Sequence, residues 1–129
     1  MIVLDTHIWV WLASESDRLT PALRRTLEPQ REDGLGVSVI SCWEVAKLVE
    51  RGRLKLACPV EQWIEAALAL PGVRLLDLTP AIAVASTQLP GAFHRDPADQ
   101  IIAATARAHD CRLLTADERI LSYEHVRTE

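Results

Sequence analysis

No run of apolar residues in this 129-residue sequence approaches the roughly 18 that a membrane-spanning helix needs. The first residues also lack the basic start of a secretory signal peptide, and Asp5 interrupts their apolar run. The cysteines (Cys42, Cys58 and Cys111) are odd in number and lack the close spacing of zinc ligands. We therefore expect small buried thiols without disulfides, in a cytoplasmic protein.

The sequence has no surplus of positive charge. It has 14 Lys and Arg residues against 18 Asp and Glu residues, a net charge of −4, and such a chain has no general electrostatic attraction for nucleic acid. Five acidic residues singled out below account for the excess, because without them the balance is 14 minus 13, or +1. Most of the basic residues are Arg, which binds phosphate bidentately. The charge neither supports nor excludes a nucleic-acid substrate.

Short apolar runs alternate with segments of helical periodicity, and no repeat, low-complexity tract or linker divides the chain. This alternation predicts one α/β domain over residues 1–129, with a mostly parallel sheet. The predicted strands are 2–5, 36–40, 73–78 and 112–115, with a final edge strand at 125–127. The predicted helices run through Trp9 and Leu12, from Thr20 to about Pro29, through Glu44 to about Gly52, and over 59–70, 79–89, 97–109 and 118–121.

Acidic residues lie near the ends of the predicted strands. Asp5 ends the first strand, Glu44 lies one helical turn after the second, and Asp117 follows the fourth. Asp99 lies in the first turn of the helix that opens at Pro97. Ligands of an open parallel sheet bind beyond the carboxyl ends of its strands, where the strand order reverses. We therefore expect these four side chains to converge at one edge of the sheet.

Each acidic residue also has an ordinary structural interpretation, since Asp, Glu, Ser and Thr are favoured at helix N-termini. Ser41 to Glu44 has the form of a capping box, with Ser41 as N-cap and Glu44 at the third helical position. For Glu44, capping and metal binding are equally supported. Asp96 precedes Pro97 as an N-cap, and capping is its main predicted role. Asp5 has the weakest structural explanation, because it closes an apolar strand.

A group of four or five carboxylates would repel one another unless a cation or shared protons intervened. Mg²⁺ and Mn²⁺ prefer such hard oxygen ligands. One or two of these ions can lower the pKa of bound water and stabilise the oxygen that leaves a phosphodiester. No serine or cysteine nucleophile pairs with a histidine base, because the four histidines occur in unrelated sequence contexts. The pattern predicts metal-dependent hydrolysis.

Other acidic α/β proteins fit less well. A haloacid-dehalogenase-like phosphatase needs a second acid two residues after its nucleophile, and here that position is His7. A phospho-acceptor receiver domain needs a late lysine, and the only lysines are Lys47 and Lys55. A non-catalytic binding module remains an alternative, although we would expect it to have lost part of the acidic set.

Four motifs together resemble the PIN-domain ribonucleases, and more narrowly the VapC-type toxins of type II toxin–antitoxin pairs. The motifs are Asp5-Thr6, Ser41-x-x-Glu44, His94-Arg95-Asp96-Pro97-Ala98-Asp99 and Leu114-Thr115-Ala116-Asp117. The resemblance covers essentially the whole chain. It implies a three-layer α/β/α fold with a central parallel sheet of about five strands. It also implies cleavage of RNA with Mg²⁺ or Mn²⁺, a homodimer, and inhibition by a cognate antitoxin protein.

The resemblance also assigns roles by position. It implies that the catalytic and metal-binding quartet is Asp5, Glu44, Asp99 and Asp117, and that the supporting residues are Asp96, Thr6, Thr115 and Ser41. Gln100 departs from the subfamily, which often carries Arg after this D-P-x-D motif. That departure removes a phosphate contact or a salt bridge and leaves the quartet intact.

Some neighbouring residues are weaker candidates. His94 and Arg95 flank the acidic helix start and could contact RNA phosphate, although a solvated loop explains them equally well. The tryptophans Trp9, Trp11 and Trp43 are expected mainly as core or interface anchors, with base stacking as the lesser alternative.

Arg51, Arg53 and Lys55 form a small basic run after the helix that carries Glu44. We expect a solvated turn there, and steering of RNA toward the site is the alternative.

Overall fold

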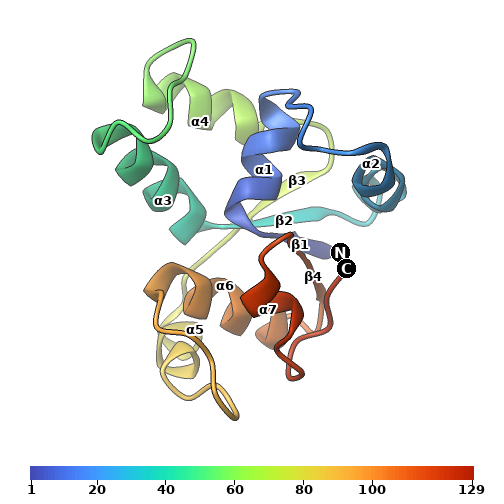
Figure 1. The fold of residues 1–129 in the computed structure, drawn as a ribbon, viewed down its shortest axis with the longest axis vertical. Coiled ribbons are helices and arrows are strands. Elements are labelled where there is room, and N and C mark those ends of the chain that lie inside the picture. The colour runs from blue at the N-terminus through green and yellow to red at the C-terminus, as the bar shows by residue number, and fades with distance from the viewer.

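Four parallel strands form the centre of the computed structural model, which describes residues 1–129 (Figure 1). They are β1 (Ile2–Leu4), β2 (Leu35–Ser38), β3 (Val73–Leu76) and β4 (Arg112–Leu114), in the order β3-β2-β1-β4. The α/β fold class is confirmed, with four strands in place of about five. The segment 125–127, expected as an edge strand, forms none, because only one isolated bridge, between Leu113 and Thr128, joins this tail to β4.

Helices cover both faces of the sheet. Figure 1 shows α1 to α4 on one side and α5 to α7 on the other. Their bounds are α1 (Thr6–Ala13), α2 (Pro21–Leu27), α3 (Val39–Glu50), α4 (Val60–Leu68), α5 (Pro80–Ser86), α6 (Pro97–Ala108) and α7 (Glu118–Leu121), with a 3₁₀ turn at Glu28–Arg31. None of these helices is long and apolar enough to cross a membrane.

Alternation along the strands supplies the two cores. Ile2 and Leu4 of β1 pack with α1, α3 and α4, whereas Val3 between them packs with α6 and α7, as expected when successive strand residues point to opposite faces. The buried Trp9 anchors the first core, and its indole N–H donates to the carbonyl oxygen of Ala67 at 3.2 Å. Alternate residues of the same short strand thus pack against the helices on opposite faces of the sheet.

The strand order changes direction at β1. The chain adds β2 and β3 on one side of β1 and then returns to add β4 on the other side. In open parallel sheets the crevice at such a reversal, beyond the carboxyl ends of the strands, is where ligands bind. Asp5 follows β1 and Asp117 follows β4, so this topology places both at the expected crevice.

The start of α3 differs from the sequence prediction. The N-cap is Ser38, whose hydroxyl accepts from the amide of Ile40 at 3.2 Å. The predicted N-cap at Ser41 and the capping box with Glu44 are therefore wrong. The β-branched pair Val39-Ile40 suggested a longer strand, but the cap at Ser38 starts the helix earlier and places Glu44 in its second turn.

Two further sequence predictions have different outcomes. Asp96 is the N-cap of α6, with Pro97 in the first turn, as predicted. The three cysteines form no disulfide, but they are half-buried and not fully buried as expected; Cys42 and Cys111 lie at the margins of the two cores.

Candidate metal centre

A cleft of about 280 Å³ opens at the carboxyl ends of β1 and β4. All five acidic residues predicted from the sequence line it, namely Asp5, Glu44, Asp96, Asp99 and Asp117. They belong to four different helices or their N-caps, on both sides of the sheet. The fold therefore gathers carboxylates that are far apart in the sequence.

Asp5 lies at the floor of the cleft and is only 2% exposed. Its Oδ1 accepts from the amide of Thr6 at 2.8 Å, and its Oδ2 accepts from the Thr115 hydroxyl at 2.7 Å. The ring nitrogen Nδ1 of His7 lies 3.6 Å from the same Oδ2. These contacts hold Asp5 in one orientation. Because each carboxylate oxygen has two lone pairs, Asp5 can still bind a ligand.

Thr6 and Ser41 form a chain of hydroxyls that ends on Glu44. The Thr6 hydroxyl donates to Glu44 Oε1 at 2.5 Å and lies 2.8 Å from the Ser41 hydroxyl. A hydroxyl has a single proton, so Ser41 donates to Thr6 and Thr6 donates to Glu44. Both hydroxyls are buried, and they therefore fix the carboxylate of Glu44 toward the cleft.

The environment of Glu44 disfavours its charge. Burial raises its pKa from 4.5 to about 7, the bond from Thr6 opposes this rise, and the negative charges of Asp99, Asp5 and Asp96 add to it. A bound cation would offset the negative charges of Asp99, Asp5 and Asp96 and so lower the pKa of Glu44 again.

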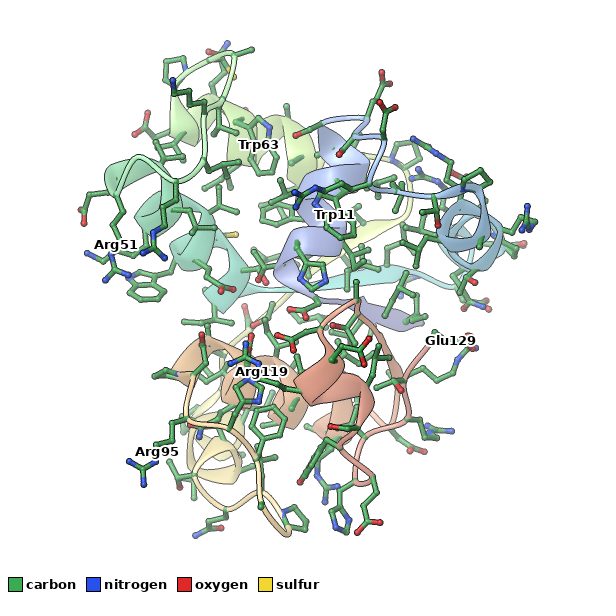
Figure 2. The ribbon with its side chains drawn as sticks, viewed as in Figure 1. Trp11, Arg51, Trp63, Arg95, Arg119 and Glu129 are labelled. Carbon is green, nitrogen blue, oxygen red and sulfur yellow. The ribbon has the colours of Figure 1, made fainter.

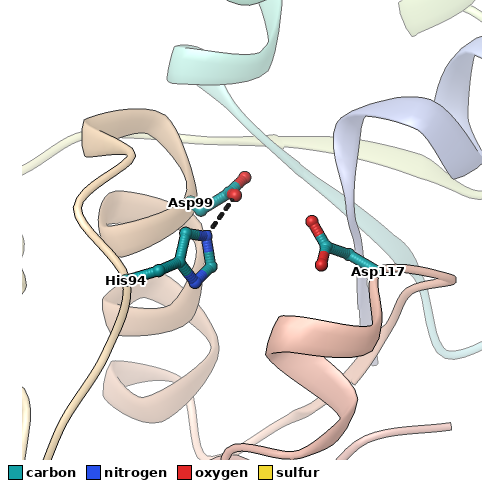
Figure 3. A group of neighbouring side chains, drawn as sticks. All are labelled: His94, Asp99 and Asp117. Atoms are coloured by element: carbon teal, nitrogen blue, oxygen red, sulfur yellow. Dashed lines mark hydrogen bonds and ion pairs between the residues drawn. The ribbon is translucent and has the colours of Figure 1, made fainter.

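Asp99 lies in the first turn of α6 and is 7% exposed. Figure 3 shows its bond with His94, whose Nε2 lies 2.6 Å from Asp99 Oδ2. Burial raises the pKa of Asp99, the His94 bond opposes the rise, and the charges of Asp5 and Asp96 increase it. Asp96 stands beside it as the cap, with Oδ1 accepting from the amides of Ala98 and Asp99 at 3.0 and 3.2 Å.

Asp117 has the opposite environment. It caps α7, and its Oδ2 accepts from Nη2 of Arg119 at 2.8 Å. This bond is the main reason that the pKa of Asp117 is lowered. The same Nη2 lies 3.7 Å from Asp99 Oδ2. Arg119 therefore supplies positive charge to two acidic side chains of the cleft.

Two groups of side chains have ligand atoms close enough to share one cation. The first is Glu44, Asp96 and Asp99, and the second is His94, Asp99 and Asp117, with ligand atoms within 4.8 Å of one another in each. Asp99 belongs to both, and Asp5 belongs to neither but lines the same cleft. The carboxylate oxygens are the hard donors that Mg²⁺ and Mn²⁺ prefer. Because the carboxylates repel one another, a cation bound between them would be stabilising. The residues present fit a divalent cation.

Sequence reasoning missed His7 and Arg119 at this site, and it missed the contact of His94 with Asp99. The histidines are not all in unrelated contexts, because His94 contacts Asp99 and His7 lies against Asp5. Only the fold could show this, because the path of the chain before α6 decides whether His94 faces Asp99, and the contact of His7 Nε2 with the amide of Ala116 decides how the His7 ring lies beside Asp5. Arg119 carried a weak signal, as a basic residue just inside a helix capped by Asp117.

The basic candidates have different positions. Arg53 lines the cleft, as the steering alternative requires. Arg95 is exposed and does not line it, and Figure 2 shows its side chain projecting outward from the molecule. Gln100 donates from Nε2 to the carbonyl oxygen of His94 at 3.1 Å, so it supports the loop that positions His94.

A family model described as the PIN domain matches residues 2–126. This chain belongs to the PIN domain family. The resemblance noted from the four motifs is therefore confirmed. The strand order and the acidic cleft of the structure agree with it.

Three known proteins are similar over nearly the whole chain. Ribonuclease VapC22 of Mycobacterium tuberculosis is 39% identical over 126 residues, which cover 98% of this chain and 94% of that protein. The structure of VapBC2 from Rickettsia felis, bound to a DNA fragment from its promoter, matches with a TM-score of 0.73 at 18% identity, covering 100% of this chain and 98% of that one.

The structure of Mycobacterium tuberculosis VapC20, a toxin that cleaves the sarcin-ricin loop, matches with a TM-score of 0.64 at 18% identity, covering 98% and 99%. At these identities the two structures show a shared fold.

Proposed function

We propose that this chain is an endoribonuclease that requires Mg²⁺ or Mn²⁺ and acts as the toxin of a toxin–antitoxin pair. The observation that carries the proposal is the convergence of five carboxylates in one cleft of a PIN-domain fold. The name of the 39% identical relative, ribonuclease VapC22, supports RNA as the substrate.

The acidic quartet of Asp5, Glu44, Asp99 and Asp117 would hold the cation, with Asp96 beside it. When bound, a divalent cation lowers the pKa of water and stabilises the negative charge that develops on a cleaved phosphodiester. The remaining contacts keep these carboxylates in place: Thr115 holds Asp5, His94 holds Asp99, and the chain from Ser41 through Thr6 holds Glu44. Such preorganised side chains need no rearrangement during the reaction.

The proposal extends to partners. The structural relatives include toxin–antitoxin complexes such as VapBC2 of Rickettsia felis, and we expect an antitoxin protein that covers this cleft, a homodimer of the toxin, and a cytoplasmic location.

The decisive experiment compares the purified protein with its Asp5→Asn variant on cellular RNA. We expect cleavage with Mg²⁺ or Mn²⁺, no cleavage with a chelator, and a loss of at least about 100-fold in the variant, since Asp5 holds the floor of the site. Mapping of the new 5′ ends identifies the RNA target. Titration calorimetry with Mn²⁺ and circular dichroism separate lost cation binding from lost fold.

Asp33→Asn is the matched control, because Asp33 is exposed and precedes β2, at the opposite edge of the sheet. It should cleave as the parent does. Cleavage by Asp5→Asn at the parent rate would refute the assignment, and absence of Mn²⁺ binding at millimolar concentration would favour the non-catalytic binding module.

A further inference from the structure

A second hollow of about 300 Å³ adjoins the acidic cleft. Its walls are His7, Trp11, Arg18, Ala116 and Asp117. Three of these residues, His7, Trp11 and Asp117, also line the acidic cleft, so a bound chain can pass from one into the other. Figure 2 shows Trp11 on α1, in the half of the molecule opposite to Arg119.

The ring of His7 is fixed between two elements. Its Nε2 accepts from the amide of Ala116 at 2.9 Å, so the proton of the neutral ring is on Nδ1, which faces Asp5 Oδ2 at 3.6 Å. These contacts hold the imidazole at the junction of the hollow and the acidic cleft. The metal centre and the hollow therefore share one rigid wall.

The indole of Trp11 lies against His7 and Arg18. The ring centroids of Trp11 and His7 are 4.9 Å apart with an interplanar angle of 55°, and the guanidinium carbon of Arg18 lies 6.0 Å from the Trp11 ring. Trp11 is half-buried and packs partly on the core, whereas Arg18 is exposed. The hollow thus has an aromatic wall supported by the core and an exposed cation at its rim.

This combination is the chemistry that binds single-stranded nucleic acid. Bases stack on aromatic side chains in a sequence-tolerant manner, and arginine contributes by contacting phosphate or by stacking on the base. A protein segment would need a more apolar surface, and here Trp11 and Ala116 are the only apolar residues of the wall. An unpaired nucleotide is therefore favoured over a protein side chain.

We propose that this hollow is a subsite for one unpaired RNA nucleotide next to the cleaved bond, with its base on Trp11 and its phosphate near Arg18. The proposal rests on the proposed ribonuclease function. It places the RNA strand across β1 and β4, with the scissile phosphate at the acidic cleft and the neighbouring base on the α1 side. It also explains why a protein of net negative charge can bind RNA, since the local contacts supply the attraction.

The test measures binding of a labelled single-stranded RNA decamer by fluorescence anisotropy in the Asp5→Asn background, so that the RNA stays intact. We expect Trp11→Leu to weaken binding about 10-fold, because one base stack is lost, and Arg18→Ala to weaken it about 3-fold. Trp11→Phe should restore most of the affinity. Trp43→Leu is the matched control, since Trp43 is 52% exposed and lines neither hollow.

In the active protein, Trp11→Leu and Arg18→Ala should raise KM, leave Mn²⁺ affinity unchanged and alter which nucleotide flanks the cleaved bond. Equal binding by Trp11→Leu and Trp43→Leu would overturn the subsite. So would a Trp11→Leu variant that loses binding to an antitoxin but not to RNA.

Arg18→Ala decides the question if Trp11→Leu is unstable, because Arg18 is exposed. Absence of RNA cleavage by the parent protein refutes the proposed function, whereas cleavage with unchanged KM and pattern in both variants refutes only the subsite.

Discussion

Glu44 and Asp117 line the same cleft, yet their pKa values move in opposite directions. On the side of α1 and α3, which we call the buried wall (Thr6, Ser41 and Glu44), a carboxylate is desolvated and accepts from a hydroxyl, and the pKa of Glu44 rises to about 7. On the side of α7, which we call the exposed wall (Asp117 and Arg119), a guanidinium pairs with the carboxylate and the pKa of Asp117 falls.

The difference shows two ways to tolerate excess negative charge in the absence of a cation. The buried wall favours a proton on Glu44, whereas the exposed wall supplies the positive charge of Arg119. A divalent cation must therefore displace a proton on one side and compete with a guanidinium on the other. Stability and cation binding should respond differently to changes on the two walls.

The largest effect should come from Thr6→Val on the buried wall. The variant keeps the shape of the side chain but removes the only hydrogen bond recorded for Glu44 and the acceptor for Ser41. Leaving the half-buried carboxylate of Glu44 and the buried hydroxyl of Ser41 without their partner costs about 3 kcal/mol of unfolding free energy, measured by urea denaturation at pH 8 with a chelator present.

Thr6→Ser is the control for this change, because it retains the hydroxyl and should cost about 1 kcal/mol or less for the lost methyl group. Equal stabilities of the Val and Ser variants would show that the hydroxyl chain contributes nothing, and the contrast between the walls would then rest on burial alone.

Glu44→Gln should change the pH dependence of stability in the chelated protein. Between pH 4.5 and about 7 the unfolded chain has released the Glu44 proton while the folded protein retains it. The unfolding free energy of the parent therefore falls as pH rises through this range. The variant lacks this loss, and we expect it to be more stable at pH 8 by about 2 kcal/mol, a value reduced for the partial exposure of the side chain.

Asp117→Asn gives the matching measurement on the exposed wall. The pKa of Asp117 is lowered, so its contribution is present above pH 3.8 and is lost as pH falls further. The contribution of Asp117 to the unfolding free energy should therefore change only slightly with pH, and with the opposite sign to the contribution of Glu44. Urea titrations from pH 3 to pH 8 measure both, and slopes of the same sign would contradict the contrast.

These two walls also show how far the sequence could predict the site. The positions of Asp5, Asp99 and Asp117 followed from local rules. Asp5 and Asp117 cap helices that follow strands, Asp99 lies in the first turn of α6, and parallel strands bring their carboxyl ends together. Their placement in one cleft needed only the alternation of strands and helices.

The partners of these acidic side chains could not be predicted in the same way. The contact of Thr6 with Glu44 spans 38 residues, and the contact of His94 with Asp99 depends on the path of a loop. Glu44 was expected to contact either its own helix or a metal, and its partner is a hydroxyl of α1. Such pairings depend on how α1, α3 and α6 pack, which periodicity does not specify.

The smallest predicted effect is on the exposed wall, where Arg119→Ala should raise the affinity for Mn²⁺ about 3-fold to 10-fold at low salt. Nη2 of Arg119 lies 2.8 Å from Asp117 Oδ2 and 3.7 Å from Asp99 Oδ2, so it competes with a cation for the same oxygens. The gain is modest because the side chain is 59% exposed and its charge is screened by solvent and salt. Titration calorimetry at 50 mM and 500 mM salt measures this gain in affinity, which should shrink at the higher concentration.

Arg25→Ala is the matched control, because it removes an equal charge from an exposed position on α2, and it should leave the Mn²⁺ affinity unchanged. A fall in Mn²⁺ affinity on removal of Arg119 would show that the guanidinium organises the carboxylates for the cation, and the exposed wall would then resemble the buried one.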